Sequence, residues 1–347
     1  MTKFRYKQSN ADHTLFIKQN NGKVAILIVY VDDMVLTGDD LEEMKSLEKK
    51  LAAKFDMKDL GQLRYFLGIE VARSKEGIFL SQRKYILDLS SETSMLACKP
   101  SKTPMEVNHS LGIYPDQIET EKTRYQRLVG KLIYLLRTRP NISYSVSIVS
   151  RFMHSPSEEH MKAVFRILRY LKGAPGKGLL FSKCNKACIE GYTDSNWVGD
   201  KTTRQSTSGY STFVEGNLVT WRSKKQKVVA TSSAEAEFRG MSYGICELLW
   251  IKSVLADLGI MHNRPMNLYC DNKATVEIAQ NPIQHDRTKH VEVDRYFIKE
   301  KLEKGVIQTP YIRSENQVVD ILTKAVSVKM FEEMIGKLDM IDIHAPT

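Results

Sequence analysis

The pattern of apolar residues changes twice along this 347-residue chain, and each change predicts a different architecture. Before about residue 98, short apolar runs alternate with turn residues, and an Asn-Asn-Gly turn at 20–22 predicts a β-hairpin formed by residues 14–18 and 24–31. From 121 to 173 the apolar residues recur at helical spacing, which predicts three helices. From Ile189 onward, strand and helix patterns alternate. We therefore expect an α/β (α+β) fold with more than one domain.

The expected elements are specific enough to be tested. Asp39 or Asp40 is expected to cap a helix that runs to about Phe55, and the third central helix is expected to open with a capping box from Ser155 to Glu158. The remaining expected strands are 34–37, 63–72, 78–80, 189–197, 208–215, 217–222, 227–231, 267–271 and 306–312, and the remaining helices are 82–91, 234–258, 272–280, 290–304 and 316–324.

The excess of basic over acidic side chains lies in the middle of the chain. The chain has 51 Lys and Arg against 41 Asp and Glu, and residues 121–183 alone hold 13 basic and 3 acidic side chains. Clustered cations favour phosphate contacts, although a solvated helical face explains them equally well. Arg166, Arg169 and Lys172 recur on one face of the third helix and are our candidate nucleic-acid contacts there.

Composition excludes several classes of protein. The longest uninterrupted apolar run, 24–31, has eight residues, whereas a membrane-spanning helix needs about 20. The first ten residues have no apolar segment typical of a secretory signal. Five cysteines are an odd and sparse set, which indicates a reduced, intracellular compartment rather than a disulfide framework.

Asp32 and Asp33 lie between two strongly apolar strand segments. Two adjacent carboxylates are costly to desolvate, and a divalent cation such as Mg²⁺ would remove that cost. The alternative is an exposed turn, where Asp is common.

Three aspartates in the last part of the chain are candidate metal ligands. Asp194 stands in the middle of a predicted strand, where Asp is disfavoured. Asp271 ends an apolar segment just before a predicted helix, so a helix N-cap is its alternative role. Asp320 lies near the start of the last predicted helix, where an acid also suits the helix dipole.

Two glutamates compete for the fourth position. Glu235 forms a capping box with Ser232 and can pair with Arg239, so it has a complete structural explanation. Glu237 lies on the apolar stripe of the same helix, where a carboxylate is costly without a cation. Four clustered carboxylates repel one another unless metal is bound, which suits a two-metal site for phosphodiester chemistry.

The basic run from Trp221 to Lys227 lies beside these carboxylates. Its lysines, Lys224, Lys225 and Lys227, could contact the phosphates of a DNA strand or discourage edge-to-edge strand pairing. Ser206, Thr207 and Ser208 could also donate to phosphate, and turn chemistry explains them as well.

Together these motifs resemble the reverse transcriptase–ribonuclease H of copia-type retrotransposons. The segment ILIVYVDDMVLTGDD resembles the catalytic hairpin of the polymerase, and DLGQLRYFLGIEV resembles its primer-gripping hairpin. GYTDSNW, TSSAEAEF, YCDNKA and ENQVVDILTK are similar, in order, to the four acidic motifs of the ribonuclease H domain. The resemblance covers almost the whole chain.

The resemblance implies four segments: a partial palm at 1–98, a basic helical thumb or connection at 99–183, a ribonuclease H-like mixed-sheet domain at 184–327 and a tail at 328–347. It makes Asp194, Glu237, Asp271 and Asp320 catalytic ligands of two Mg²⁺ ions, with Mn²⁺ as a substitute, and makes Asp32 and Asp33 ligands of the polymerase metal. Many cellular ribonucleases H carry a mobile His before the last helix, but residues 311–316 contain none. His290 is in the family-like string RTKH, and packing or capping is its alternative role.

The sequence thus favours a metal-dependent endoribonuclease that cuts the RNA strand of an RNA–DNA hybrid. The alternative is a retroelement remnant or hybrid-binding module without turnover. The expected partner is a hybrid or template–primer duplex rather than a membrane, and the sequence indicates no oligomeric state. Family resemblance places the protein in the cytoplasm, in a virus-like particle, or in the nucleus.

The polymerase of the family needs a third aspartate and nucleotide-binding fingers upstream of the catalytic hairpin. Since there is no room for them before Asp32, we expect this chain to be the C-terminal portion of a polyprotein that cannot polymerise DNA by itself. A primer-extension assay with the purified chain should show no incorporation, and template-dependent incorporation would contradict this expectation.

Overall fold

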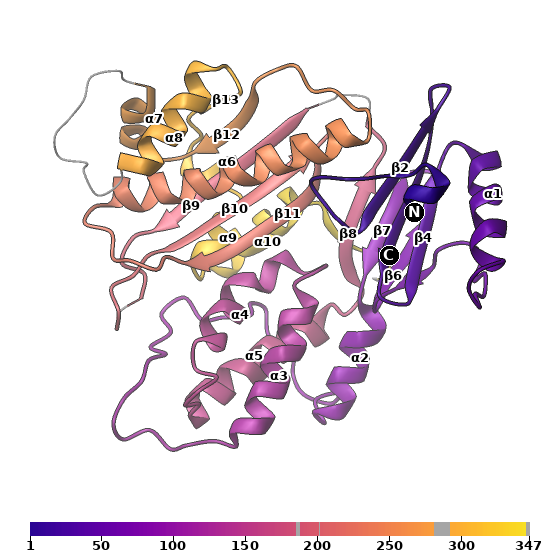
Figure 1. Ribbon diagram of the computed structural model, residues 1–347. Coiled ribbons are helices and arrows are strands. Elements are labelled where there is room, and N and C mark those ends of the chain that lie inside the picture. Colours follow the sequence, from indigo (N-terminus) through magenta and orange to yellow (C-terminus); the bar gives the residue numbers. More distant parts are fainter. Residues whose placement is uncertain (185–187, 201, 281–291, 345–347) are drawn as a thin grey trace. The chain divides into compact units, whose positions relative to one another are not determined.

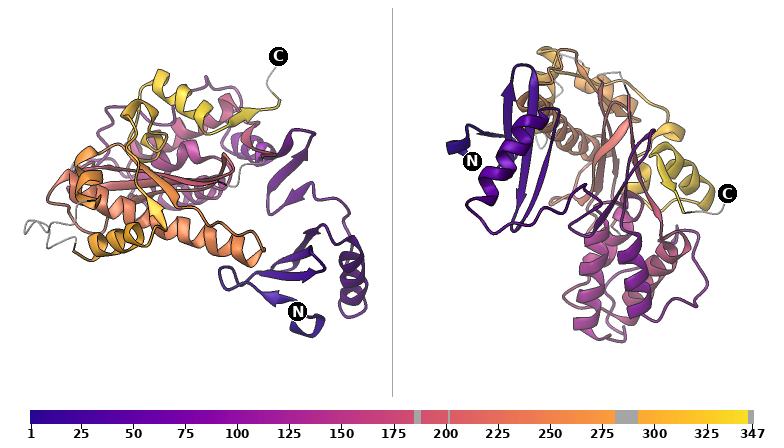
Figure 2. Two further views of the ribbon diagram at one scale, coloured as in Figure 1. Left: turned by 90° about the horizontal axis from the view of Figure 1, so that it is seen from above. Right: turned by 90° about the vertical axis from the view of Figure 1, so that its right-hand side faces the viewer.

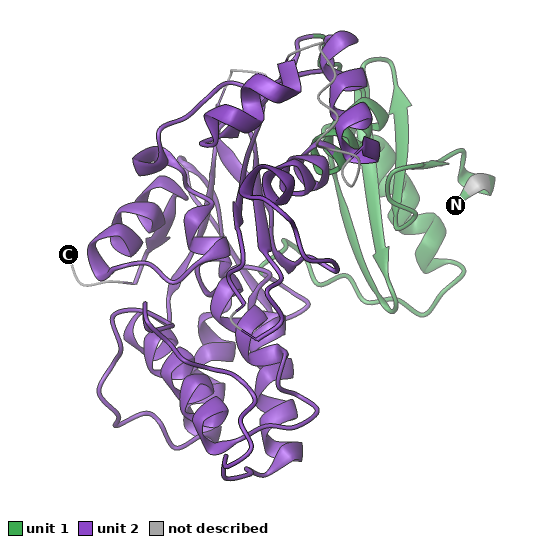
Figure 3. Ribbon diagram, turned by 90° about the vertical axis from the view of Figure 1, so that its left-hand side faces the viewer, with its two compact units in different colours: residues 1–64, 246–263 green, residues 65–245, 264–347 purple. Residues whose placement is uncertain are grey.

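The structure, a computed structural model, describes residues 1–184, 188–200, 202–280 and 292–344. Three sheets and their helices confirm the predicted mixed α/β class (Figure 1). The chain divides into two compact units, one of residues 1–64 with 246–263 and one of residues 65–245 with 264–347 (Figure 3). Among the described residues, no helix is long and apolar enough to cross a membrane.

The first unit is built on an antiparallel sheet of β1 (Lys7–Gln8), β2 (Leu15–Asn20), β3 (Lys23–Tyr30) and β4 (Asp33–Gly38), in that order. Asn21 and Gly22 both have positive φ and make the predicted turn between β2 and β3. Asp40 caps α1 (Leu41–Ala52), which packs against β3 and β4 (Figure 2). The core of this unit consists of Tyr6, Ala25, Leu27, Leu47 and Leu51.

The end of α6 (Ser233–Asp257) also belongs to the first unit. Asp257 accepts a hydrogen bond of 2.7 Å from the Ser9 hydroxyl, and the Trp250 indole N–H donates to the carbonyl of Ala11 at 2.9 Å. The division between the two units therefore falls within α6.

The second sheet lies in the larger unit and has the order β14-β8-β7-β6-β5. The strand predicted at 63–72 is wrong, because it is a hairpin of β5 (Tyr65–Phe66) and β6 (Ile69–Arg73). Leu67 and Gly68 have positive φ and form its turn, and a Cβ at Gly68 would lie 2.7 Å from the Tyr134 hydroxyl. The other members are β7 (Gly77–Ser81), β8 (Lys177–Ser182) and β14 (Met340–Asp342), and β7 leads into α2 (Arg83–Glu92).

The basic segment forms α3 (Lys122–Leu135), η2 (Pro140–Ile142), α4 (Ser143–Ser150) and α5 (Glu158–Gly173), which confirms the three predicted helices. The capping box predicted from Ser155 to Glu158 is wrong, since Ser157 caps α5 and His160 completes the box. An antiparallel bridge from Glu119 to Ser157 keeps the chain extended up to Ser157, so the helix begins only at Glu158.

The third sheet has the order β11-β10-β9-β12-β13. The strands β9 (Ile189–Asn196), β10 (Thr207–Val214) and β11 (Asn217–Lys225) are antiparallel, whereas β12 (Met266–Cys270) runs parallel to β9 and β13 (Ile307–Gln308) parallel to β12. This meander with two parallel strands beside it is the ribonuclease H-like sheet that the resemblance implies. The associated helices are α6, α7 (Lys273–Gln280), α8 (Glu292–Glu303), η4 (Ser314–Asn316), α9 (Asp320–Thr323) and α10 (Val328–Lys337).

The strand predicted at 227–231 is wrong. The structure has one longer strand, β11, and the following residues lead to the start of α6 with Val228 and Val229 exposed. Two backbone carbonyls of this segment accept hydrogen bonds from side chains. The Gln205 amide donates to the carbonyl of Lys227, and the Trp197 indole N–H donates to that of Ala230. Among the described residues, no strand pairs with this segment.

Two glycines bring helices close to the third sheet. A Cβ at Gly240 of α6 would lie 2.6 Å from the Ser195 hydroxyl of β9. A Cβ at Gly209 of β10 would lie 2.8 Å from methyl groups of Val319 and Thr323, at and just before α9. Glycine at these positions lets helices approach both β9 and β10 closely.

The helices of the basic segment and the third sheet share one hydrophobic core. Residues 328–344, which we expected in a tail, form α10 and β14 and contribute to this core. Buried members from the basic helices, α9 and α10 include Leu128, Leu132, Val149, Ile167, Ile321, Leu322, Phe331 and Leu338.

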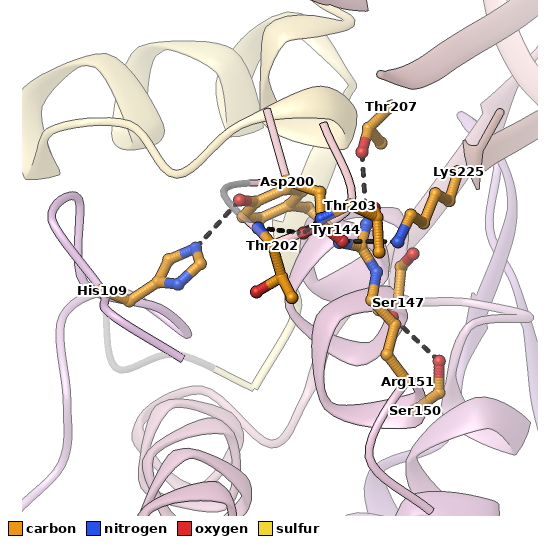
Figure 4. Close-up of polar contacts among 10 residues, drawn as sticks. All are labelled: His109, Tyr144, Ser147, Ser150, Arg151, Asp200, Thr202, Thr203, Thr207 and Lys225. Atoms are coloured by element: carbon orange, nitrogen blue, oxygen red, sulfur yellow. Dashed lines mark hydrogen bonds and ion pairs between the residues drawn. The ribbon is translucent and has the colours of Figure 1, made fainter. Parts of the chain in front are cut away.

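A charged contact fixes α4 beside β10 and β11 (Figure 4). Arg151, at the end of α4, donates to Asp200 at 3.1 Å and to the Thr207 hydroxyl at 3.2 Å. Asp200 also pairs with Lys225 of β11. Burial by itself raises the pKa of Asp200, but hydrogen bonds from Lys225 and from the backbone N–H groups of Thr203 and Thr202 outweigh it and hold that pKa well below its usual range.

Asp200→Asn should therefore destabilise the larger unit by about 1–3 kcal/mol at pH 7, because two cations lose their buried partner. A carboxylate with a depressed folded pKa contributes stability above its unfolded pKa of about 4 and loses it as the pH falls through the folded value. Urea unfolding followed by circular dichroism should show the difference from wild type shrinking between pH 5 and pH 3. Asp116→Asn, at an exposed position, is the matched control, and a pH-independent deficit in Asp200→Asn would contradict the account.

Candidate metal centre and nucleic-acid contacts

Three of the predicted acidic residues lie together in the larger unit. Asp194 of β9, Glu237 of α6 and Asp271, just after β12, each offer a carboxylate oxygen within 4.8 Å of the others. The sheet explains part of this arrangement, because Cys270 pairs with Thr193 in the parallel β9–β12 ladder and the next residue on each strand is one of the aspartates. Glu237 approaches from the start of α6, where its carboxylate accepts from the Ser195 backbone N–H at 3.3 Å.

Two of the three carboxylates have little contact with water, and Asp271 is half-buried. Asp194 and Glu237 are each only 5% exposed. Burial raises the pKa of Asp194, and burial together with the negative charge of Asp194 raises the pKa of Glu237 well above its usual value. Buried carboxylates that repel one another are the donor set that Mg²⁺ prefers, so these residues fit a divalent metal ion.

Asp320, the fourth predicted ligand, lies next to this group but outside the set within 4.8 Å. It begins α9, is 1% exposed and forms a 2.9 Å ion pair with Lys324 one turn later. Burial, followed by the charge of Asp194, raises its pKa, while Lys324 opposes the shift. Thr323 of the same helix donates its hydroxyl to Asp194, so α9 is joined directly to the cluster.

The two competing glutamates have different surroundings. Glu235 accepts at one oxygen from the backbone N–H and hydroxyl of Thr231 and at the other from Arg239 at 2.6 Å. Its own N–H bonds to Ser232, so the carboxylate is fully used at the helix start. The structure thus brings Glu237, and not Glu235, to the aspartates.

The residue that caps α7 is Asn272, and not Asp271, for which capping was the alternative role. Asn272 accepts from the backbone N–H of Thr275 at 3.0 Å in the first turn of α7. Asp271 instead accepts from the Ser314 hydroxyl at 2.7 Å. Ser314 lies in the stretch 311–316, which precedes the last acidic motif.

The sequence analysis missed four residues that touch these acids: Ser314, Thr323, Lys324 and Cys270. The spacing of Lys324, four residues after Asp320, is a sequence signal for an ion pair within a helix. Cys270, fully buried, places its thiol 4.0 Å from Glu237. No local pattern indicated Ser314 or Thr323, because their partners are distant in the sequence.

Asp32 and Asp33 lie in the other unit, at the tip of the β3–β4 hairpin. Both are exposed, and the preceding Val31 has a φ of 51°, an unusual conformation for a β-branched residue. In the described part of the chain, neither aspartate belongs to a group of three side chains able to share a metal ion. Their proposed role therefore rests on the resemblance of the hairpin.

Two of the three predicted cations of α5 bind groups within the protein. Arg166 donates to Glu106 at 2.7 Å and to the Thr103 hydroxyl, and Lys172 donates to the carbonyl of Cys98. At Arg169 the contact is made by the backbone carbonyl, which accepts from the Ser101 N–H, and not by the guanidinium. These contacts give α5 a structural explanation for part of its positive charge.

The three candidate lysines after Trp221 have different surroundings. Lys225 pairs with Asp200, and the ammonium of Lys224 lies 4.9 Å from the centre of the Tyr243 ring. Lys227 is exposed.

His290 falls in the segment 281–291, outside the described residues.

Comparisons with known proteins agree with the resemblance. Residues 1–107 match the family model "Reverse transcriptase (RNA-dependent DNA polymerase)". The retrovirus-related Pol polyprotein from transposon RE1 of Arabidopsis thaliana is 40% identical over 333 residues, which cover 96% of this chain and 23% of that protein. The putative transposon Ty5-1 protein of Saccharomyces cerevisiae is 31% identical over 251 residues, which cover 72% of this chain and 82% of that protein.

A solved structure of LC11-RNase H1 in complex with RNA/DNA hybrid is 16% identical, with a TM-score of 0.30 over 39% of this chain and 93% of that one.

The transposon relatives define the class, which is a retroelement protein with a reverse transcriptase segment. The chain belongs to the retrovirus-related Pol polyproteins of copia-type transposons, and it spans about a quarter of the RE1 polyprotein.

Divalent metal should stabilise the larger unit through Glu237. At about 100 times its dissociation constant, Mn²⁺ contributes about 2.7 kcal/mol, or a rise of about 5–10 °C in Tm. Glu237→Gln should lose this rise and start from a higher Tm without metal, because one repelling charge is gone. Differential scanning calorimetry with and without Mn²⁺ measures both effects.

Glu235→Gln is the matched control for this experiment. It should keep the Mn²⁺-dependent rise and start from a lower Tm, because it weakens the contacts with Thr231 and Arg239. The reverse pattern, with the rise lost in Glu235→Gln and kept in Glu237→Gln, would contradict the assignment.

Proposed function

We propose that the larger unit is a metal-dependent endoribonuclease that cuts the RNA strand of RNA–DNA hybrids. The observation that carries this proposal is the convergence of Asp194, Glu237 and Asp271 within 4.8 Å in a buried site. Membership in the Pol polyprotein family supports it, since the chain combines these acids with a reverse transcriptase segment.

The side chains of the site have separable roles in this proposal. Asp194, Glu237 and Asp271 provide the oxygen ligands, and Asp320 completes the set from α9. Ser314 and Thr323 orient Asp271 and Asp194 by donating their hydroxyls. Lys324 compensates part of the negative charge through its pair with Asp320.

Two Mg²⁺ ions, or Mn²⁺ in their place, are the cofactor that this donor set favours. When bound, they supply the Lewis acidity that lowers the pKa of the attacking water and stabilises the leaving oxygen of a phosphodiester. The carboxylates would hold the positive charge of the metal ions in a largely buried site, where electrostatic interactions are stronger than in water.

We further propose the division into a partial palm, a basic thumb or connection, a ribonuclease H-like domain and a C-terminal segment as a functional map of the chain. The surplus of ten positive charges between residues 121 and 183 supports nucleic acid as the partner, and an intracellular location follows from the family. On this map, the exposed lysine Lys227 remains a candidate phosphate contact.

A cleavage assay with labelled duplexes tests the proposal. The wild-type chain with Mg²⁺ should cut the RNA strand of a hybrid and leave a 3′-hydroxyl, without cutting single-stranded RNA or duplex DNA. Asp271→Asn should lower the rate by more than about 100-fold, because even the loss of a partner around a metal ligand costs about 10–100-fold.

Hybrid affinity measured in the same samples separates the two candidate functions. Asp271→Asn should retain binding, and Glu235→Gln should retain cleavage. Wild-type protein that binds the hybrid but never cuts it would replace the endoribonuclease by a hybrid-binding remnant.

A further inference from the structure

A groove of about 640 Å³ lies between α4 and β11, entirely within the larger unit. One wall comes from α4, and the other comes from residues 219–223 of β11. The end of α3 and Ile69 close it. Because β11 is the edge strand of the third sheet, its outer side has no neighbouring strand among the described residues.

The lining of this groove is cationic and rich in hydroxyls. It contains two arginines, Arg137 and Arg222, and no acidic residue. Both arginines are exposed, and neither forms an ion pair within the described ranges. The hydroxyl residues are Ser143, Ser147, Ser150, Thr220 and Ser223. Arginine and serine are the side chains that commonly contact phosphate and sugar.

Two of these hydroxyls are buried without a partner. The oxygens of Ser143 and Ser223 have no hydrogen-bond partner in the part of the chain that the structure describes. Ser143 is only 3% exposed. Buried polar groups in folded proteins are nearly always satisfied, so a pair of unsatisfied hydroxyls along one groove indicates a missing acceptor.

The walls of the groove are held in place. The Arg151–Asp200–Lys225 contact anchors α4, which also carries Ser147 and Ser150 (Figure 4). On the other wall, the Trp221 indole N–H donates to the carbonyl of Leu136 at 3.0 Å, which joins β11 to the end of α3. The backbone of a groove fixed in this way needs little rearrangement when a ligand binds, and the buried hydroxyls of Ser143 and Ser223 reach the ligand by side-chain rotation.

The sheet register gives the distance from the groove to the acidic cluster. Ser223 pairs with Gly209, and Gly209 pairs with Asp194 on the adjacent strand. Two interstrand steps of about 4.8 Å put the backbones of Ser223 and Asp194 about 10 Å apart. The groove and the acidic cluster therefore lie on one sheet, with Val319, Leu322 and Thr323 packed over Gly209 between them.

We propose that this groove binds the phosphodiester backbone of one strand of a nucleic-acid duplex. Arg137 and Arg222 neutralise its phosphates, and Ser143 and Ser223 donate to its oxygens. Apolar residues such as Val146 and Val219 contact the sugars between them. The assignment rests on the proposed function for its ligand, but binding does not require cleavage.

Salt-dependent hybrid binding, measured in EDTA so that no cleavage occurs, tests the cationic contacts. Arg137→Gln and Arg222→Gln should each lower the slope of log K against log salt by about 0.9, and the double variant by about 1.8. Arg73→Gln, at an exposed arginine that does not line the groove, should leave the slope unchanged.

Single methylphosphonates, placed in turn along each strand, locate the contact. Removing one phosphate charge should weaken binding to the wild type at one or two adjacent positions and have no further effect there on the double variant. Inorganic phosphate at equal ionic strength should compete only weakly, since several contacts act on one strand. An unchanged salt slope in the double variant, or strong competition by free phosphate with no position-specific loss, would overturn the proposal.

Ser143→Ala separates ligand binding from folding. Removing an unsatisfied buried hydroxyl should leave Tm equal or higher, while hybrid affinity falls. A variant with lower Tm and unchanged hybrid affinity would show that this hydroxyl serves the fold, and would remove it from the proposed contact.

The binding experiments remain informative if the chain proves unable to cut hybrid. In that outcome the endoribonuclease proposal fails, while an altered slope and a located phosphate would still establish the groove. Conversely, a chain that cleaves hybrid with unaltered slopes in the arginine variants would retain the proposed function and lose the groove.

Discussion

The repulsion among buried carboxylates is the interaction on which the rest of the larger unit depends. Asp194 and Glu237 are almost completely removed from water, and Asp271 completes the group. Folding alone compensates these charges only in part, because Lys324 forms an ion pair with Asp320 and also acts on Asp194. Uncompensated buried charge is strongly destabilising, so the proposed cation would offset the energetic cost of this site. Stability and proposed activity are therefore linked at the same oxygens.

The surrounding fold brings these acids together from distant parts of the chain. The parallel pairing of β9 with β12 sets two aspartates side by side, and the glycine at 240 lets α6 approach β9. The α9 helix attaches through Thr323, and its apolar residues join the core shared with the basic helices. The Arg151–Asp200–Lys225 contact then ties α4 to the sheet. The basic helices thus share the larger unit and its hydrophobic core with the third sheet.

Much of this could be predicted from the sequence where local patterns are decisive. The Asn-Gly hairpin, the three basic helices and the preference for Glu237 over Glu235 follow from turn chemistry, helical spacing and capping. The apolar pattern at 63–72 predicted one strand, whereas the resemblance implied a hairpin in this segment, and its turn at Leu67 and Gly68 lies against Tyr134. The partners of Asp271 and Asp194, Ser314 and Thr323, are set by tertiary packing between segments far apart in the sequence. The groove likewise requires side chains from several elements, so no single motif contains it.

Diffraction from crystals of the full chain soaked in Mn²⁺, recorded near the manganese absorption edge, tests the central claim most directly. The account predicts anomalous peaks between the carboxylates of Asp194, Glu237 and Asp271, with metal–oxygen distances of about 2.1 Å, close to those of Mg²⁺. A well-ordered site without an anomalous peak, with the carboxylates in contact only with Lys324 and hydroxyl groups, would contradict it.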